Sequence, residues 1–350
     1  MTLPVLPVQP AGVAFPTAAW PEGDLPSGVD RGRIEAIVDH AVSPASLETM
    51  GETHAVLVVQ GGRVVLERYA EGYGPDNTYP SWSMAKSITQ ALVGIAVGDG
   101  LMDIAKRADV PEWAGAGDPR GPITLDLLLR MSSGLAFVED YVREHPSDVI
   151  AMLFGEGQAD VAAYAAAKPL VHAPGSFWSY SSGTSNIVSR CLARAIDAFG
   201  PDFEAFMRAR LFEPIGMTSP IPKFDQAGVF IGSSYCFCTA RDFARFGLLY
   251  LRDGVWDGRR LLPEGWVDYA RTETFQQPND EYGPYGAHWW LGLGGPGSFS
   301  ANGYAGQFTI VVPDLDMIVV RHGDTPLALK NAPRDWLGAL IGLFREGMAG

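Results

Sequence analysis

Cysteine is scarce in this chain of 350 residues. Cys191, Cys236 and Cys238 form neither a disulfide framework nor a Cys-x-x-Cys pair. An odd number of isolated cysteines is typical of proteins from a reducing compartment. We therefore expect three small core residues and a cytoplasmic protein.

Long apolar runs and basic residues near the N-terminus are also missing. No run of about 18 apolar residues exists, so we expect no membrane-spanning helix. The first 25 residues contain no lysine or arginine, unlike a signal or transit peptide, and four prolines precede position 20. We interpret residues 1–29 as an extended N-terminal arm on the surface.

Positive charge is in deficit, with 26 Lys and Arg against 40 Asp and Glu and a formal net charge of −14. Such a surface repels phosphate backbones and anionic lipids, so neither nucleic acid nor a membrane is an expected partner. The six histidines show no metal-binding spacing, and we expect no metal and no cofactor. The Gly-x-Ser-x-Gly elbow of α/β-hydrolases is absent as well.

What the chain does contain is a single Ser-x-x-Lys motif at residues 83–86. It opens the apolar segment 84–97, which is typical of a buried helix. Residues three apart share one face of a helix, so the side chains of Ser83 and Lys86 can meet. Free N–H groups at a helix start suit a developing oxyanion. The pattern indicates a nucleophile with a lysine base, although a capping serine and a solvated lysine have the same letters.

Strand and helix patterns fall into blocks along the chain. Residues 54–70 predict a hairpin, and further strand patterns occupy 287–294, 306–313 and 317–323. Helical patterns occupy 30–43, 84–97, 124–131, 147–154, 159–168, 185–199, 203–212, 238–254 and 331–347.

This order predicts an α/β (α+β) fold. Strands at both ends of a chain imply one antiparallel sheet flanked by helices. We assign residues 30–100 and 230–350 to this sheet domain and residues 101–229 to an inserted, mainly helical lobe. The active site is expected between the lobes.

Two further motifs could complete the site. Tyr180 begins the sequence Tyr-Ser-Ser in a loop, where its phenol could relay a proton between the nucleophile and the leaving group, or simply pack as an aromatic. The sequence YAGQ at 304–307 places glycines at a strand edge, against which a substrate can lie. The backbone N–H of Gln307 would then supply a second oxyanion donor beside that of Ser83.

The order Ser-x-x-Lys, Tyr-Ser-Ser, Tyr-Ala-Gly resembles the serine β-lactamase/penicillin-binding-protein superfamily. The segments PLVHAPGSFWSYSSGTSN and GYAGQFTIVVPDLDMIVV are similar to class C-like esterases and to 6-aminohexanoate-dimer (nylon-oligomer) hydrolases. The resemblance covers roughly residues 30–345. It implies a β-lactamase/transpeptidase-like fold with Ser83, Lys86 and Tyr180 as catalytic residues.

The resemblance also implies residues that contact the substrate. Tyr141 in FVEDYV is similar to a tyrosine that contacts the substrate amide in nylon-oligomer hydrolases, although a surface aromatic is an equal alternative. Ser182, Tyr304 and Gly306 come from the second and third motifs. From the residues alone, Trp290 is a candidate wall of an apolar acyl pocket, with core packing as the alternative. The segment 137–160 is a candidate lid.

Two departures from the superfamily pattern narrow the expected activity. Ser182 stands where β-lactamases and penicillin-binding proteins have asparagine, and Tyr304 stands where they have lysine or histidine. No cation is therefore expected for a β-lactam carboxylate, and ester or amide hydrolysis fits better than β-lactamase activity.

The sequence thus predicts a serine hydrolase that cleaves a carboxylic ester or a small linear amide through an acyl-enzyme on Ser83. The general base is Lys86 or Tyr180; as a base near neutral pH, Lys86 needs its pKa lowered from ~10.4 to around 7, worth ~4–5 kcal/mol. The alternatives are a D-amino-acid peptidase, β-lactamase or acyltransferase using the same serine, and a non-catalytic ligand-binding protein. The oligomeric state is left open.

Overall fold

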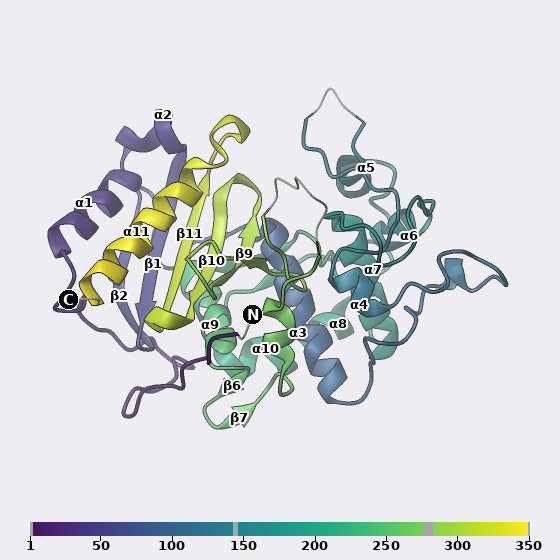
Figure 1. The fold of residues 1–350 in the computed structure, drawn as a ribbon, viewed down its shortest axis with the longest axis horizontal. Coiled ribbons are helices and arrows are strands. Elements are labelled where there is room, and N and C mark those ends of the chain that lie inside the picture. Colours follow the sequence, from purple (N-terminus) through teal and green to yellow (C-terminus); the bar gives the residue numbers. More distant parts are fainter. Residues whose placement is uncertain (1–2, 143–145, 276–282, 349–350) are drawn as a thin grey trace.

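The computed structural model describes residues 3–142, 146–275 and 283–348. Its main sheet has six antiparallel strands in the order β2-β1-β11-β10-β9-β8 (Figure 1). Their bounds are β1 Glu52–Gln60, β2 Arg63–Tyr69, β8 Trp290–Leu291, β9 Phe299–Gly303, β10 Gln307–Val312 and β11 Met317–Asp324. Because β1 pairs with β11, the sheet joins the two ends of the chain, and the predicted fold class is confirmed.

Helices cover both faces of this sheet. Along β1, Val56 and Val58 point toward the face covered by α1 and α11, whereas Leu57 and Val59 belong to the cluster on the opposite face with α3 and α9. This alternation follows from the period of two in a strand. The covering helices are α1 Arg31–Ala41, α3 Ala85–Gly98, α9 Ala240–Leu251 and α11 Ala332–Met348.

The helical part of the chain lies beyond α3, on the right in Figure 1. It contains α4 Leu125–Leu129, α5 Asp148–Phe154, α6 Val161–Ala166, α7 Ser182–Ala195 and α8 Pro201–Met207, which continues into a π-helical turn, Arg208–Phe212. Helix α7 contacts α3, α4, α5 and α6 and so forms its centre. The predicted lobe boundaries at 100/101 and 229/230 stay predictions.

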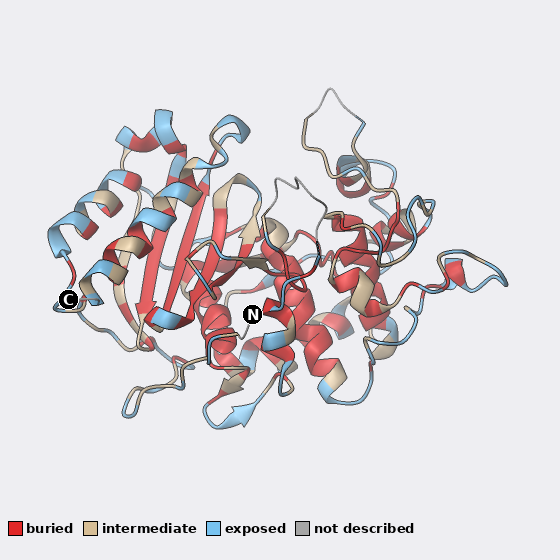
Figure 2. Ribbon diagram, in the orientation of Figure 1, coloured by how far each residue is buried: buried red, intermediate tan, exposed pale blue. Residues whose placement is uncertain are grey.

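Helix α3 is the most enclosed helix of the site. Every residue from Ala85 to Ala96 is buried, as the red colour of α3 in Figure 2 shows. Its sequence is mostly apolar and its few polar side chains are buried too, which is typical of a helix packed between other layers. Any polar side chain on this helix, Lys86 included, is therefore removed from water.

The N-terminal segment follows the sheet-domain helices without regular structure of its own. Backbone carbonyls of this segment accept hydrogen bonds from the guanidinium groups of Arg245 (Pro16 O, 2.8 Å) and Arg271 (Pro4 O, 2.6 Å). Trp20 Nε1 donates to the carbonyl of Arg241 at 3.2 Å. These contacts attach the segment to α9 and to α10 (Trp266–Arg271).

Several details differ from the sequence predictions. The predicted strand 287–294 is reduced to Trp290–Leu291, because His288 (φ 59°) and Gly292 (φ 82°) break the extended chain. Strand β9 was not predicted, since FSANG is short and only partly apolar. Helix α7 begins three residues earlier than predicted, where the Ser181 side chain accepts from the backbone N–H of Thr184.

The other elements are short. They are α2 Leu47–Met50, a three-stranded sheet of β3 Thr78–Tyr79, β4 Ile221–Pro222 and β5 Cys236–Thr239, and a hairpin of β6 Val255–Trp256 and β7 Arg259–Arg260. All three cysteines are buried and unpaired, as predicted for small core residues. In the described part of the chain, no helix combines the length and the apolar character needed to cross a membrane.

Candidate active site

Ser83 lies in a 3-10 turn, Trp82–Met84, that leads directly into α3. Ser81 anchors this turn, since its Oγ donates to the carbonyl of Ser234 (3.1 Å) and accepts from the backbone N–H of Cys236 (2.9 Å). Trp82 adopts φ 42°, a left-handed conformation that is uncommon for a bulky non-glycine residue. The turn thus fixes Ser83 at the head of a buried helix.

Lys86 lies one helical turn further, and its side chain is only 1% exposed. Its Nζ is 3.0 Å from Ser83 Oγ, 3.0 Å from Ser182 Oγ and 3.0 Å from the carbonyl oxygen of Ser233. The structure therefore brings the serine and the lysine of the first motif into direct contact, with the second motif on the other side of the amine.

Burial lowers the pKa of Lys86 from 10.5 to about 8, and the negative charge of Glu139 opposes this by raising it. Desolvation disfavours the charged ammonium form, which explains the direction. A lysine base near neutral pH was expected to have a pKa around 7. A pKa of about 8 still leaves a useful fraction of neutral amine at neutral pH.

The second motif enters from the start of α7. Ser182 is the first residue of this helix and contacts Lys86 directly, whereas Tyr180 turns the face of its ring toward the amine, with Nζ 4.9 Å from the ring centroid. The Tyr180 ring also packs against Tyr285 and Trp290, at centroid distances of 5.8 and 5.2 Å. Lys86 thus contacts Ser83 and Ser182 directly and lies against the ring of Tyr180.

Glu139 was not singled out from the sequence, yet it binds the second motif. Its carboxylate accepts hydrogen bonds from the backbone N–H (2.7 Å) and the Oγ (2.5 Å) of Ser182 and from the Tyr141 hydroxyl (2.6 Å). The available signal was its place in FVEDYV, two residues before Tyr141. Glu139 is therefore connected to Lys86 through the Ser182 hydroxyl, which contacts both side chains.

The third motif reaches the site through Tyr304. Its ring is 5.0 Å from the ring of Tyr141 and 5.9 Å from that of Trp82. Gln307, expected to supply the backbone donor, is only 1% exposed, and its Nε2 donates to the carbonyl of Gly323 at 2.6 Å. Gly306 has φ 83°, and its carbonyl accepts from Arg321 Nη1 at 2.7 Å.

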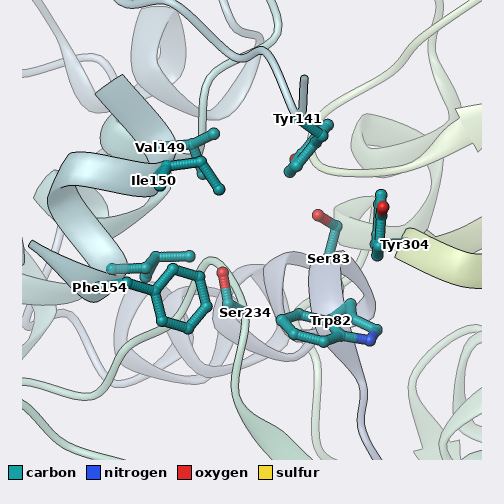
Figure 3. A pocket seen from close by; sticks show the side chains of 9 residues that line it. Trp82, Ser83, Tyr141, Val149, Ile150, Phe154, Ser234 and Tyr304 are labelled. Atoms are coloured by element: carbon teal, nitrogen blue, oxygen red, sulfur yellow. The ribbon is translucent and has the colours of Figure 1, made fainter. Parts of the chain in front are cut away.

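A pocket of about 210 Å³ opens in front of Ser83. Figure 3 shows the Ser83 hydroxyl directed into the space between Tyr141 and Tyr304 on one side and the side chains of α5 on the other. Its lining consists of Trp82, Ser83, Tyr141, Val149, Ile150, Leu153, Phe154, Ser234 and Tyr304. The wall on α5 is apolar, and the sequence did not reveal it because the pattern of residues 147–154 indicates only a helix.

Several expected residues lie away from this pocket. Gly306, Gln307 and Trp290 are not part of its lining, and Ser182 is buried behind Lys86. Trp290 contacts Tyr180, whereas its neighbour Trp289 is fully buried in the core. In the candidate lid 137–160, residues 143–145 lie outside the described residues, and the rest carries α5.

His288, buried next to the site, is a structural residue. Its Nδ1 lies 2.7 Å from the carbonyl of Leu129 and its Nε2 lies 2.9 Å from Ser185 Oγ. Burial lowers its pKa to about 3, so it is neutral at physiological pH. Its side chain therefore supports the packing behind Lys86 rather than offering a second base.

The sequence and the fold are similar to those of several known proteins. The chain is 27% identical over 313 residues to a 6-aminohexanoate-dimer hydrolase of Paenarthrobacter ureafaciens, covering 84% of this chain and 77% of that protein. A family VIII carboxylesterase has a similar fold, with a TM-score of 0.66, 14% identity and coverage of 91% and 99% of the two chains.

A penicillin-binding protein homologue from Caulobacter crescentus is another structural neighbour, with a TM-score of 0.62, 19% identity and coverage of 92% and 99%. At these low sequence identities, the two solved structures show only that the fold is shared. The resemblance inferred from the three motifs is confirmed, because residues 47–340 match the family described as Beta-lactamase. The protein therefore belongs to the beta-lactamase family, whose members are generally serine hydrolases.

Proposed function

We propose that this protein is a serine hydrolase that cleaves carboxylic esters or small linear amides through an acyl-enzyme on Ser83. The observation that carries the proposal is the 3.0 Å contact between Lys86 Nζ and Ser83 Oγ at the base of an open pocket. A nucleophile with a partly neutral amine beside it is the arrangement that acyl transfer requires.

In the first step, Ser83 Oγ attacks the substrate carbonyl and Lys86 accepts its proton. The backbone N–H of Ser83 stabilises the oxyanion. The sequence predicts the backbone N–H of Gln307 as the second donor, and we keep this assignment, because Gln307 begins β10 directly after the turn whose Tyr304 lines the pocket with Ser83. Lys86, assisted by Tyr180, then returns the proton to the leaving group, and water repeats the sequence on the acyl-enzyme.

The pocket favours a neutral acyl group of moderate length. Its volume of about 210 Å³ is below the roughly 300–1,000 Å³ of pockets for drug-sized ligands, which suits a small substrate. Neither lysine nor arginine lines it in the described residues, so a carboxylate would lose its hydration without a partner. A short aliphatic chain against α5 gains hydrophobic contact instead.

The relatives support the same class of reaction. The Paenarthrobacter ureafaciens relative is named for hydrolysis of the 6-aminohexanoate dimer, and the family VIII neighbour is named a carboxylesterase. We favour an ester over that dimer here, because a linear dimer of an amino acid carries charged ends that this apolar pocket does not match.

The test combines labelling with turnover. Incubation with a fluorophosphonate should give a single adduct on Ser83 by intact-mass and peptide mass spectrometry, and p-nitrophenyl butyrate should be hydrolysed. Ser83→Ala should lose both properties while its unfolding temperature stays unchanged. Labelling without turnover on ester or amide panels would favour a peptidase or acyltransferase, and neither labelling nor turnover would indicate a ligand-binding protein.

A further inference from the structure

We propose that Glu139 is a positioning residue that directs the lone pair of neutral Lys86 toward the hydroxyl of Ser83. It acts through Ser182, which lies between the carboxylate and the amine. This inference rests on the proposed function, since it concerns the proton transfer that activates Ser83.

The direction of each hydrogen bond around Ser182 is set by what its partners can donate. The Glu139 carboxylate has no hydrogen, so it accepts from both the N–H and the O–H of Ser182. The Tyr141 hydroxyl also lies within hydrogen-bond reach of Ser182, but the charged carboxylate at 2.5 Å is the stronger acceptor for the single hydrogen of the Ser182 hydroxyl. Toward Lys86, at 3.0 Å, Ser182 Oγ acts only as an acceptor.

The hydrogen-bond partners of Lys86 Nζ also set the direction of its lone pair. A neutral lysine has two N–H donors and one lone pair. The carbonyl of Ser233 accepts one N–H and Ser182 Oγ accepts the other, each at 3.0 Å. The third contact of Nζ is Ser83 Oγ, so the lone pair lies toward the nucleophile, which is the orientation that a general base needs.

Without this carboxylate, the Ser182 hydroxyl is free to rotate. It can then donate to the lone pair of Lys86, which turns an N–H toward Ser83 and makes the amine unproductive as a base. Glu139 is also held in place by the Tyr141 hydroxyl at 2.6 Å. The arrangement thus explains why a glutamate from the helical lobe reaches across to the second motif.

The negative charge of Glu139 has a second effect, on the pKa of Lys86. In the described part of the chain, Glu139, Tyr180 and His288 interact with Lys86, and Tyr141 and Tyr285 interact with Glu139 and Tyr180. Burial raises the pKa of Tyr141 and Tyr285 and lowers that of His288, so all three are neutral, whereas the negative charge of Glu139 raises the pKa of Lys86. Removing its charge should therefore lower the pKa of Lys86.

The first test is Glu139→Gln, which keeps the shape of the side chain. With p-nitrophenyl butyrate, we expect kcat to fall roughly ten- to a hundredfold with KM within about threefold, because binding does not depend on the lone pair. The acid limb of the kcat profile should move to lower pH. Glu156→Gln, the same change at an exposed glutamate of the same lobe, is the matched control and should match the wild type.

A double-mutant cycle tests the route through Ser182. Ser182→Ala should lower kcat by a similar factor, and Glu139→Gln should cost little more in that background, since the relay is already gone. The proposal would be overturned if the losses of kcat in the two single variants multiplied in the double variant. An unchanged kcat in either single variant would overturn it as well. If Glu139→Gln unfolds, as thermal denaturation would show, an unchanged kcat in Ser182→Ala still overturns it.

The same experiments distinguish a failure of the proposed hydrolase function from a failure of the role of Glu139. Failure of the wild type to label at Ser83 or to turn over esters would refute the proposed function itself. An active wild type with an unaffected Glu139→Gln variant would refute only the role of Glu139.

Discussion

The pH dependence of the reaction is the sharpest consequence of a buried Lys86. The amine must be neutral to accept the proton of Ser83, and burial lowers its pKa from 10.5 to about 8. The difference corresponds to about 3 kcal/mol between the two protonation states. A solvated lysine of ordinary pKa would be almost entirely protonated throughout the physiological range.

The expected profile has a single acid limb. Below pH 8, kcat/KM should fall about tenfold per pH unit, and above pH 8 it should approach a plateau. The assay is hydrolysis of p-nitrophenyl butyrate over a pH series from acid to alkaline in overlapping buffers, corrected for spontaneous hydrolysis. His288 does not produce this limb, because burial lowers its pKa to about 3. A flat profile from about two pH units below the Lys86 pKa to about one above it would refute Lys86 as the base.

The same shift affects stability. Because the pKa of folded Lys86 is lowered, the folded state releases this proton near pH 8 while the unfolded state keeps it until about 10.5. Stability from this group is therefore lowest below pH 8 and increases as pH rises from 8 to 10.5, by up to about 3 kcal/mol. The difference in unfolding free energy between the wild type and Lys86→Met, measured by urea denaturation at several pH values, isolates this contribution.

Three further substitutions test other parts of the site. Tyr180→Phe should lower kcat about 10²- to 10⁴-fold with an unchanged unfolding temperature, since the ring packing is kept; a near-wild-type kcat would remove Tyr180 from the reaction. Phe154→Ala should raise KM for p-nitrophenyl hexanoate about three- to tenfold and leave p-nitrophenyl acetate unaffected, because only the longer chain reaches α5; equal effects on both esters would contradict an acyl pocket there. Gly306→Ala should destabilise the fold by about 2–4 kcal/mol in urea denaturation, since its φ is 83° and an added Cβ would lie 2.1 Å from Arg321 Nη1; an unchanged midpoint would show that this turn relaxes at no cost.

The first motif could be read from the sequence because its geometry is local. Residues i and i+3 share one face of a helix, so the spacing of Ser83 and Lys86 indicated a contact that the structure confirms. The apolar composition of α3 likewise predicted the burial that lowers the pKa of Lys86. Strand patterns at both ends of the chain were sufficient for the antiparallel sheet.

Contacts between segments far apart in the chain could not be predicted from the sequence. Glu139 and Ser182 are 43 positions apart, and no local pattern says that a lobe glutamate reaches the start of α7. The third motif also required the fold, because the backbone between β9 and β10 decides that Tyr304 faces the pocket while Gln307 is buried. The apolar wall on α5 is an ordinary helix face until its neighbours are known.

The sequence by itself thus determined the contact between Ser83 and Lys86 and the antiparallel sheet, since periodicity and short-range spacing are properties of the local backbone. The tertiary structure decided the direction of the hydrogen bonds and the shape of the pocket. Those depend on how loops from the helical lobe are placed against α3 and β9, and such placement is set by packing between segments far apart in the chain.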